Sequence, residues 1–125
     1  MRKLNTLFLV MLSSMLHANQ LGENTYQIAC KNCHSPKLAV AIKAPAAFDT
    51  KAWNKRFDNA EQESKSNPTQ FKTPIDYLVY NVKIGKGLMY HGGLCNESDE
   101  PNKNCSDEAF TQAIYYMSDR KAAAE

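Results

Sequence analysis

The segment Cys30-Lys31-Asn32-Cys33-His34 is the most informative stretch of this chain, because it has the pattern C-x-x-C-H. This pattern is typical of covalent haem attachment, in which both thiols form thioethers with the porphyrin and the histidine ligates the iron. Residues three and four apart lie on one face of a helical turn, so Cys30 and Cys33 can reach the vinyl groups on one side of a porphyrin. Because the motif occurs once, it predicts one haem c held by Cys30, Cys33 and His34.

Two other kinds of site use cysteines at this spacing. A thioredoxin-like dithiol follows a strand in a βαβ unit, but residues 22–29 lack the alternation of a strand. A structural zinc site needs a second close pair of cysteines or histidines. The remaining cysteines, Cys95 and Cys105, have nine residues between them. Both alternatives therefore fit the sequence less well than a haem does.

The N-terminal residues 1–18 have the pattern of a secretory signal peptide. Arg2 and Lys3 form a basic start, residues 4–16 are mostly apolar, and Ala18 offers a small residue for cleavage. The apolar stretch is shorter than the about 20 residues that a membrane span needs, so an uncleaved anchor is the weaker alternative. Haem is joined to C-x-x-C-H outside the cytoplasm. We therefore expect export to the periplasm and a single haem domain at residues 19–125.

The charge of the chain changes when this signal is removed. The full chain has 15 basic and 13 acidic residues and a formal net charge of +2. Without Arg2 and Lys3 the numbers are 13 and 13, so the basic character belongs to the signal. Nucleic-acid binding is therefore not expected. The remaining chain, about 107 residues, is long enough for one domain.

The sequence predicts an all-α domain. A first helix over about 22–33 should stop near Ser35, because Pro36 disfavours helical backbone at the residue before it. An irregular segment over 37–50 and a short helix over 51–60 should follow. No stretch has a convincing strand pattern.

Two further helices have clear start signals. Thr73 is a suitable N-cap, with Pro74 at the first helical position and Gly85 near the end. Ser106 precedes the last helix, whose first turn is acidic. The polar run 58–70 is expected to be a surface loop or a frayed helix end. Apolar residues at helical spacing predict a buried stripe on each helix, formed by Ile75, Leu78, Val79 and Val82 on the first and by Phe110, Ala113, Ile114 and Met117 on the second.

A haem iron ligated by His34 has a second axial position, for which few donors exist beyond residue 18. Met117 lies on the apolar stripe of the last helix, where a thioether is usually core packing. Met89 lies in a loop just after two glycines, where the backbone can approach a flat cofactor. His91 in the same loop could offer an imidazole instead, or replace Met89 at alkaline pH. Met89 is the expected ligand, and an open position is the remaining alternative.

An ordered set of residues accompanies the haem motif along most of the expected mature chain. It comprises Gly22, Tyr26, Ala44-Pro45, Trp53, Arg56, Met89, a cysteine pair before the last helix, and Tyr116-Met117. With this set the chain resembles the class I c-type cytochromes, especially the small monohaem bacterial cytochromes of the c-five type. The resemblance implies a cytochrome c-like fold with about four helices around one covalently bound haem.

The resemblance also implies roles for residues near the haem. The Pro45 carbonyl would accept a hydrogen bond from the ring of His34 and so orient it. Trp53 and Arg56 would lie near the haem propionates, where an indole N–H or a guanidinium offsets negative charge. Purely structural roles, a turn for Pro45 and core packing for Trp53, are the alternatives.

A structural role is implied for Gly22. Without a side chain it would let the first and last helices cross closely. The nearby Tyr26 would then pack against Tyr115 or Tyr116.

The chain departs from the family pattern in two places. Family members usually have two prolines after the ligand methionine, whereas Tyr90 and His91 follow Met89 here, so the loop should be less restrained. The cysteine pair is normally close together, whereas Cys95 and Cys105 enclose a polar insertion. We expect these cysteines to form a disulfide in an exported protein. The insertion is either a tolerated surface loop or a recognition element for a partner.

Electron transfer is the expected function, since two protein ligands on the iron leave no site for a substrate. The resemblance implies a cytochrome bc-type complex as electron donor and a terminal oxidase or reductase as acceptor. We expect the protein to be a monomer. Lysines near the expected haem edge could steer an acidic partner; these are Lys31, Lys37, Lys43, Lys72, Lys83 and Lys86. The alternatives are a haem enzyme or gas sensor with a labile sixth ligand, and a haem subunit of a larger redox complex.

Overall fold

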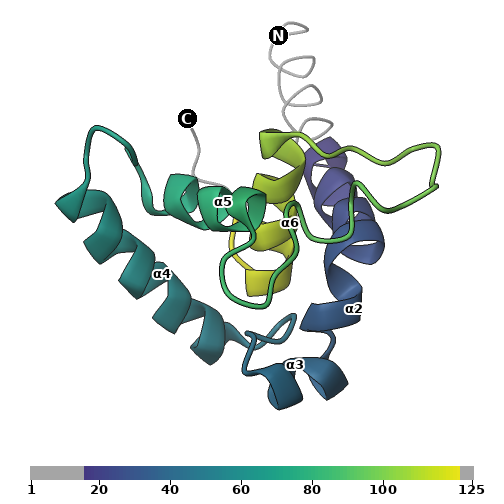
Figure 1. Cartoon of the computed structure of the whole chain (residues 1–125), viewed down its shortest axis with the longest axis horizontal. Helices are drawn as coiled ribbons and strands as arrows, with labels where there is room; N and C mark the ends of the chain where they lie inside the picture. The colour runs from purple at the N-terminus through teal and green to yellow at the C-terminus, as the bar shows by residue number, and fades with distance from the viewer. Residues whose placement is uncertain (1–15, 122–125) are drawn as a thin grey trace, which may run out of the picture.

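The computed structural model describes residues 16–121, and this part of the chain is helical without any strand (Figure 1). The predicted all-α class is therefore confirmed. An α-helix over residues 16–25 leads directly into the elements named in Figure 1 and one short π-helical turn. In chain order these are η1 (Tyr26–Cys30), α2 (Lys31–His34), α3 (Pro36–Ile42), α4 (Thr50–Ser66), α5 (Pro74–Ile84) and α6 (Asp107–Ser118).

The first helix is longer than predicted and contains a π turn. It is helical from residue 16, the first described position, to the end of α2. Within η1 the Lys31 amide bonds to the carbonyl of Tyr26, five residues earlier. Ser35 then has extended backbone, which ends the helix before Pro36 as expected. Most of the predicted signal peptide, residues 1–15, lies outside the described residues.

Two predictions for the middle of the chain are wrong. The segment 37–50 was expected to be irregular, but its first part belongs to α3, which Pro36 starts at the first helical position. The helix predicted over 51–60 continues to Ser66, so most of the polar run 58–70 is helical. Packing of α4 against α5 stabilises this extension despite its polar sequence. Ala60 is fully buried there, against Phe71 and Tyr77.

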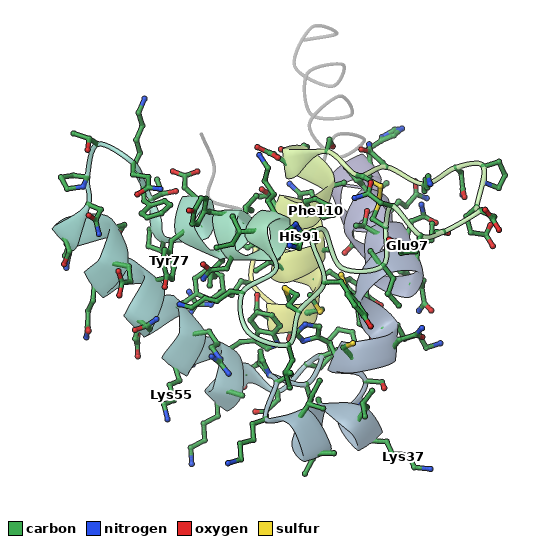
Figure 2. The ribbon with its side chains drawn as sticks, viewed as in Figure 1. Lys37, Lys55, Tyr77, His91, Glu97 and Phe110 are labelled. Carbon is green, nitrogen blue, oxygen red and sulfur yellow. A yellow bond between two sulfur atoms is a disulfide. The ribbon has the colours of Figure 1, made fainter. Side chains whose placement is uncertain are left out.

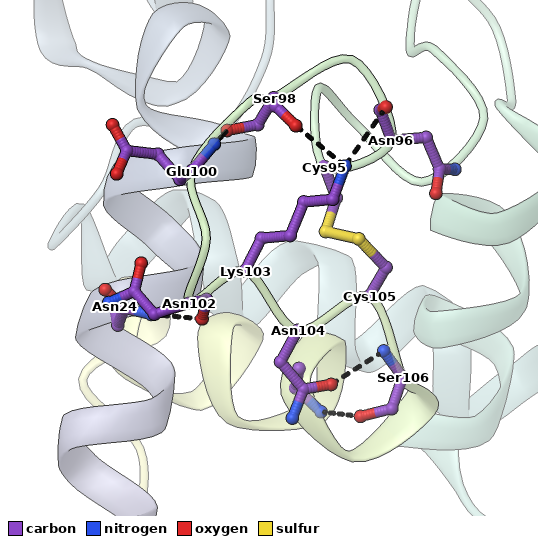
Figure 3. Close-up of a disulfide and its surroundings, with 11 residues drawn as sticks. Asn24, Cys95, Asn96, Ser98, Glu100, Asn102, Lys103, Asn104, Cys105 and Ser106 are labelled. Atoms are coloured by element: carbon purple, nitrogen blue, oxygen red, sulfur yellow. Dashed lines mark hydrogen bonds between the residues drawn. A yellow bond between two sulfur atoms is a disulfide. The ribbon is translucent and has the colours of Figure 1, made fainter.

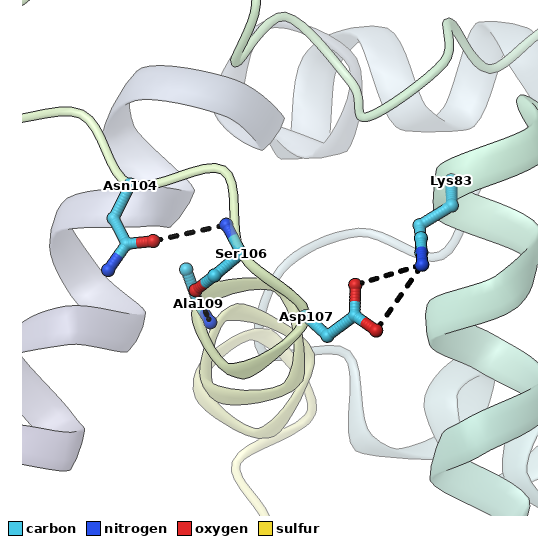
Figure 4. A network of polar contacts seen from close by, with 5 residues as sticks. All are labelled: Lys83, Asn104, Ser106, Asp107 and Ala109. Carbon is cyan, nitrogen blue, oxygen red and sulfur yellow. Dashed lines mark hydrogen bonds and ion pairs between the residues drawn. The ribbon is translucent and has the colours of Figure 1, made fainter.

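The predicted starts of α5 and α6 are confirmed. Thr73 and Asp76 form a capping box at α5, and Gly85 ends that helix in the left-handed conformation. At α6 the Oγ of Ser106 accepts a hydrogen bond from the Ala109 amide at 3.2 Å (Figure 4). The same figure shows Lys83 of α5 paired with Asp107 at 3.1 Å, an exposed contact that links the two helix ends.

The core lies around α6, which packs against α4, α5 and η1 (Figure 1). Phe110, Ala113, Ile114 and Met117 are all buried, as their spacing predicted. On α5 the predicted stripe is only partly buried, since Val79 is buried and the other three members are half-buried. Tyr77, which the stripe did not include, is buried instead.

The close crossing predicted at Gly22 is confirmed. A Cβ atom placed on Gly22 would lie 2.5 Å from the backbone carbonyl oxygen of Gln112 in α6. Beside this crossing, the rings of Tyr26 and Tyr116 are 5.4 Å apart between centroids.

We expect Gly22→Ala to lower the free energy of unfolding by about 1–3 kcal/mol, because backbone must move to accommodate the methyl group. Denaturant unfolding tests this, with the exposed neighbour Glu23→Ala as control. Equal stability of the two variants would contradict the crossing.

Candidate functional site

The predicted site residues surround one cavity of about 390 Å³ in the middle of the helices. It is lined by Cys30, Cys33 and His34 from the motif and by Met89 from the loop after α5. Pro45, Trp53 and Arg56 also line it. The rest of the wall is largely apolar and includes Leu78, Val82, Leu94, Phe110 and Ile114. A mostly apolar cavity of this size with a few polar groups is suited to a bound cofactor.

The motif cysteines are free thiols at the cavity wall, each partly buried. Burial, with a smaller contribution from Cys33, raises the pKa of the Cys30 thiol to about 12. Dithiol oxidoreductases need the opposite, a thiol whose pKa is lowered so that the thiolate can attack. The other two cysteines are joined to each other and so cannot complete a zinc site with Cys30 and Cys33. The surroundings of these thiols therefore count against a dithiol oxidoreductase and against a zinc site of four cysteines.

His34 is buried and held at two points by the loop after α3. Its Nδ1 lies 2.8 Å from the carbonyl oxygen of Pro45, as the family resemblance implied. Because a carbonyl can only accept, Nδ1 carries the proton and Nε2 keeps a free lone pair. The His34 carbonyl in turn accepts the Ala47 amide at 2.7 Å. Burial lowers the pKa of His34, which favours the neutral imidazole that a metal requires.

Trp53 lies against His34 on the same side of the cavity. The two rings are stacked, with centroids 5.9 Å apart and planes at 28°. The indole N–H donates to the Ala46 carbonyl at 2.9 Å, and the Arg56 guanidinium donates to the Lys43 carbonyl at 3.1 Å. Both side chains therefore line the predicted site while bonding to main chain. Their contact with haem propionates stays a prediction.

The loop between α5 and Cys95 supplies the candidate sixth ligand. Met89 is half-buried and lines the cavity, whereas its neighbours Leu88 and Tyr90 are 80% and 67% exposed. His91 is exposed and is not among the residues that line the cavity. The geometry thus favours Met89 over His91. Met117, expected to be core packing, is 3% exposed and lines the cavity as well.

Sequence reasoning missed the contribution of α5 and of Tyr77 to this cavity. Leu78 and Val82 were predicted to face the core, and their i, i+4 spacing could have placed them on the cavity wall. Tyr77 also lines the cavity, and its hydroxyl accepts a hydrogen bond from Lys86 Nζ at 2.7 Å. No pattern in the sequence pointed to this last contact.

Among the lysines named from the sequence, Lys43 and Lys86 line the cavity, while Lys83 is paired with Asp107. The charge is uneven along the chain: residues 31–56 carry six basic residues and one acid, and 97–108 carry five acids and one lysine. Figure 2 shows Lys37 and Lys55 at one end of the molecule and Glu97 well away from them. The basic side includes α3 and the start of α4.

The predicted disulfide between Cys95 and Cys105 is confirmed, with Cα atoms 5.8 Å apart (Figure 3). Inside the insertion, Lys103 Nζ donates to the Ser98 carbonyl at 2.7 Å. The Asn24 amide reaches the Asn102 carbonyl at 3.5 Å, so the insertion also contacts the N-terminal helix. The insertion is therefore a surface loop that is closed by the disulfide and held by hydrogen bonds within itself and to the N-terminal helix.

Removing this disulfide should lower stability while leaving the cavity wall in place. On the chain-entropy model, closing a loop of this size contributes roughly 2–3 kcal/mol. We expect the double variant Cys95→Ala, Cys105→Ala to lose about that much free energy of unfolding in denaturant titrations. Reduction of the wild-type protein should have the same effect. Unchanged stability in both experiments would show that the disulfide does not constrain the unfolded chain.

Comparison of the chain with known protein families, with curated proteins and with solved structures produced no match. Within residues 16–121, no helix combines the length and apolar character that crossing a bilayer would require. The functional assignment therefore depends on the residues around the cavity.

Proposed function

We propose that this protein is an exported monohaem c-type cytochrome that carries single electrons between respiratory redox partners. The observation that carries the proposal is that Cys30, Cys33, His34 and Met89 line the same apolar cavity. Two thiols, an oriented imidazole and a thioether are the donor set of such a haem. The residues present therefore fit the group.

Each residue has a defined task in this proposal. Cys30 and Cys33 would hold the porphyrin through thioethers, and His34 would ligate the iron through Nε2 while Pro45 orients its ring. Met89 would be the other protein ligand of the iron. A thioether there favours the reduced iron and raises the reduction potential. When bound, the haem supplies reversible one-electron chemistry. Apolar residues such as Leu78 and Phe110 line the cavity and would shield the bound group from water.

The proposed partners follow from the family resemblance and from the charges. A cytochrome bc-type complex would be the donor and a terminal oxidase or reductase the acceptor. The basic side of the molecule, with Lys37, Lys43 and Lys55, suits transient docking to an acidic surface. Association rates measured against such a partner should fall with rising ionic strength.

One observation favours a second candidate, a haem protein with a labile sixth ligand that binds small molecules. Met89 lies between two strongly exposed side chains, and the prolines that stiffen this loop in the family are absent. This candidate predicts high-spin iron or rapid binding of carbon monoxide to the reduced protein. A haem subunit of a larger complex would instead co-purify with its partner in stoichiometric amounts.

Absorption spectra of the exported protein, oxidised and reduced, test the proposal. We expect haem that stays attached after denaturation, a low-spin reduced spectrum, and the iron-to-sulfur charge-transfer band in the oxidised state. Protein without covalently bound haem would refute the proposal. Covalent haem with high-spin iron and fast carbon monoxide binding would replace it by the second candidate.

A further inference from the structure

The π turn η1 contacts the segment that follows the Met89 loop. The carbonyl oxygen of Ala29, the residue just before Cys30, accepts the backbone N–H of Leu94 at 2.9 Å. A π turn adds one residue to the helical turn, which shifts the carbonyls relative to an ordinary α-helix, and such turns are frequent at functional sites. One carbonyl of this turn therefore links the haem-attachment helix to a segment more than 60 residues later in the chain.

Gly93 makes this contact possible. A Cβ atom placed on it would lie 2.5 Å from the Ala29 carbonyl oxygen, so no larger residue fits without moving one of the two backbones. Its φ of +60° is also in the left-handed region that favours glycine. Gly93 and Ala29 are consequently in close backbone contact beside the cavity, which both residues line.

The loop that carries Met89 is held to α5 by a backbone hydrogen bond at each of its ends. At the start of the loop, the Gly85 amide bonds to the Asn81 carbonyl at 3.1 Å. At its end, the Gly92 amide bonds to the Val82 carbonyl at 2.8 Å. Residues 86–91 form the tip between these two points on α5. The next contact along the chain is the one with Ala29, made by Gly93 and the Leu94 amide, which lie four and five residues after Met89. It is made to η1 rather than to α5.

We propose that Gly93 is a positioning residue, which holds the Met89 loop on the haem-attachment helix through its contact with Ala29. Because Ala29 adjoins Cys30, the same contact sets the place of Met89 relative to the attachment side of the cavity. This coupling compensates for the prolines that are missing after Met89. The inference rests on the proposed function, since it concerns how firmly Met89 reaches the iron.

The chain offers a matched pair of variants for the test. Gly92 and Gly93 both have positive φ, of +71° and +60°, so alanine is strained at either position. A Cβ atom on Gly92, however, meets no backbone, since its nearest neighbour is the side-chain amide of Asn96 at 3.2 Å, and Gly92 does not line the cavity. We expect Gly93→Ala to lose most of the iron-to-sulfur band and Gly92→Ala, which keeps the amide bonded to Val82, to keep it. The reduced Gly93→Ala protein should bind carbon monoxide on the order of tenfold faster, the change that about 1.4 kcal/mol in ligand attachment produces.

Two further measurements separate positioning from general stability. Gly22→Ala is expected to destabilise the fold at the crossing with α6, away from this contact, and it should keep the band. Hydrogen exchange at the Leu94 amide reports the contact without reference to the iron, and we expect it to accelerate at least about tenfold in Gly93→Ala but not in Gly92→Ala. Equal bands and equal Leu94 protection in the two glycine variants would overturn the proposal.

The wild-type protein provides a test that does not depend on the folding of a variant. During denaturant titration, the iron-to-sulfur band and the protection of Leu94 should be lost together. Loss of the band while Leu94 stays protected would overturn the coupling. Failure of the proposed function gives a different result. Wild-type protein without haem, or with haem but without the iron-to-sulfur band, would refute that function at any level of protection of the Leu94 amide.

Discussion

Replacement of Cys30 and Cys33 together by alanine should abolish covalent haem attachment completely. These are the two thiols at the cavity wall, and the disulfide that occupies Cys95 and Cys105 leaves no other thiol for a porphyrin. Without thioethers, any haem that enters the cavity is held only by axial ligands and apolar contacts. It should then dissociate when the protein is denatured. Haem staining after denaturing electrophoresis and the intact mass of the purified protein measure this directly.

The second cysteine pair provides the matched control. The variant Cys95→Ala, Cys105→Ala also loses two sulfur atoms, but these are not at the cavity wall. It should retain covalent haem at the wild-type level while being less stable. If both double variants lost haem equally, attachment would depend on correct folding rather than on the motif thiols. Retention of haem by the Cys30, Cys33 variant would refute the proposed function.

The fold was most predictable where local chemistry alone determines a helix end. Thr73, Pro74 and Gly85 determine the limits of α5 through capping and backbone preferences, and Ser106 does the same for the start of α6. Such signals act within a few residues and need no knowledge of the rest of the structure. The polar part of α4 has no comparable signal. It is helical because Ala60 and its neighbours pack on α5, a tertiary effect that overrides local preference.

The candidate site was predictable in its residue types but not in its details. The motif spacing placed Cys30, Cys33 and His34 on one helical face, and the structure brings them to one cavity. The contact between His34 and Pro45 was expected only through the family resemblance. The contact between Ala29 and Gly93 could not be foreseen, because it depends on a π turn and a left-handed glycine distant in sequence. Contacts between backbone atoms leave almost no pattern in side-chain types.

Substitution of Met89 by leucine should remove the proposed sixth ligand and change the spectrum, the binding of small ligands and the reduction potential together. Leucine has about the same volume as methionine, so the loop should keep its packing at a cost below about 1.5 kcal/mol. The iron-to-sulfur band should disappear and carbon monoxide should bind the reduced protein. Loss of the thioether also removes a preference for the reduced iron. For a one-electron couple about 59 mV corresponds to tenfold, so a hundredfold loss would lower the potential by about 120 mV.

Met117→Leu is the control for Met89→Leu, since Met117 also lines the cavity and loses the same sulfur atom. Its side chain lies on the buried face of α6, where it contributes packing to the core. We therefore expect the band and the potential to stay near their wild-type values. The reverse result, loss of the band in Met117→Leu alone, would assign the sixth ligand to α6 instead of the loop.

If Met89→Leu instead became low-spin without binding carbon monoxide, another protein donor would have replaced Met89. Loss of that low-spin state in a double variant with His91→Ala would identify the donor as His91, which would then have to turn from its exposed position toward the cavity.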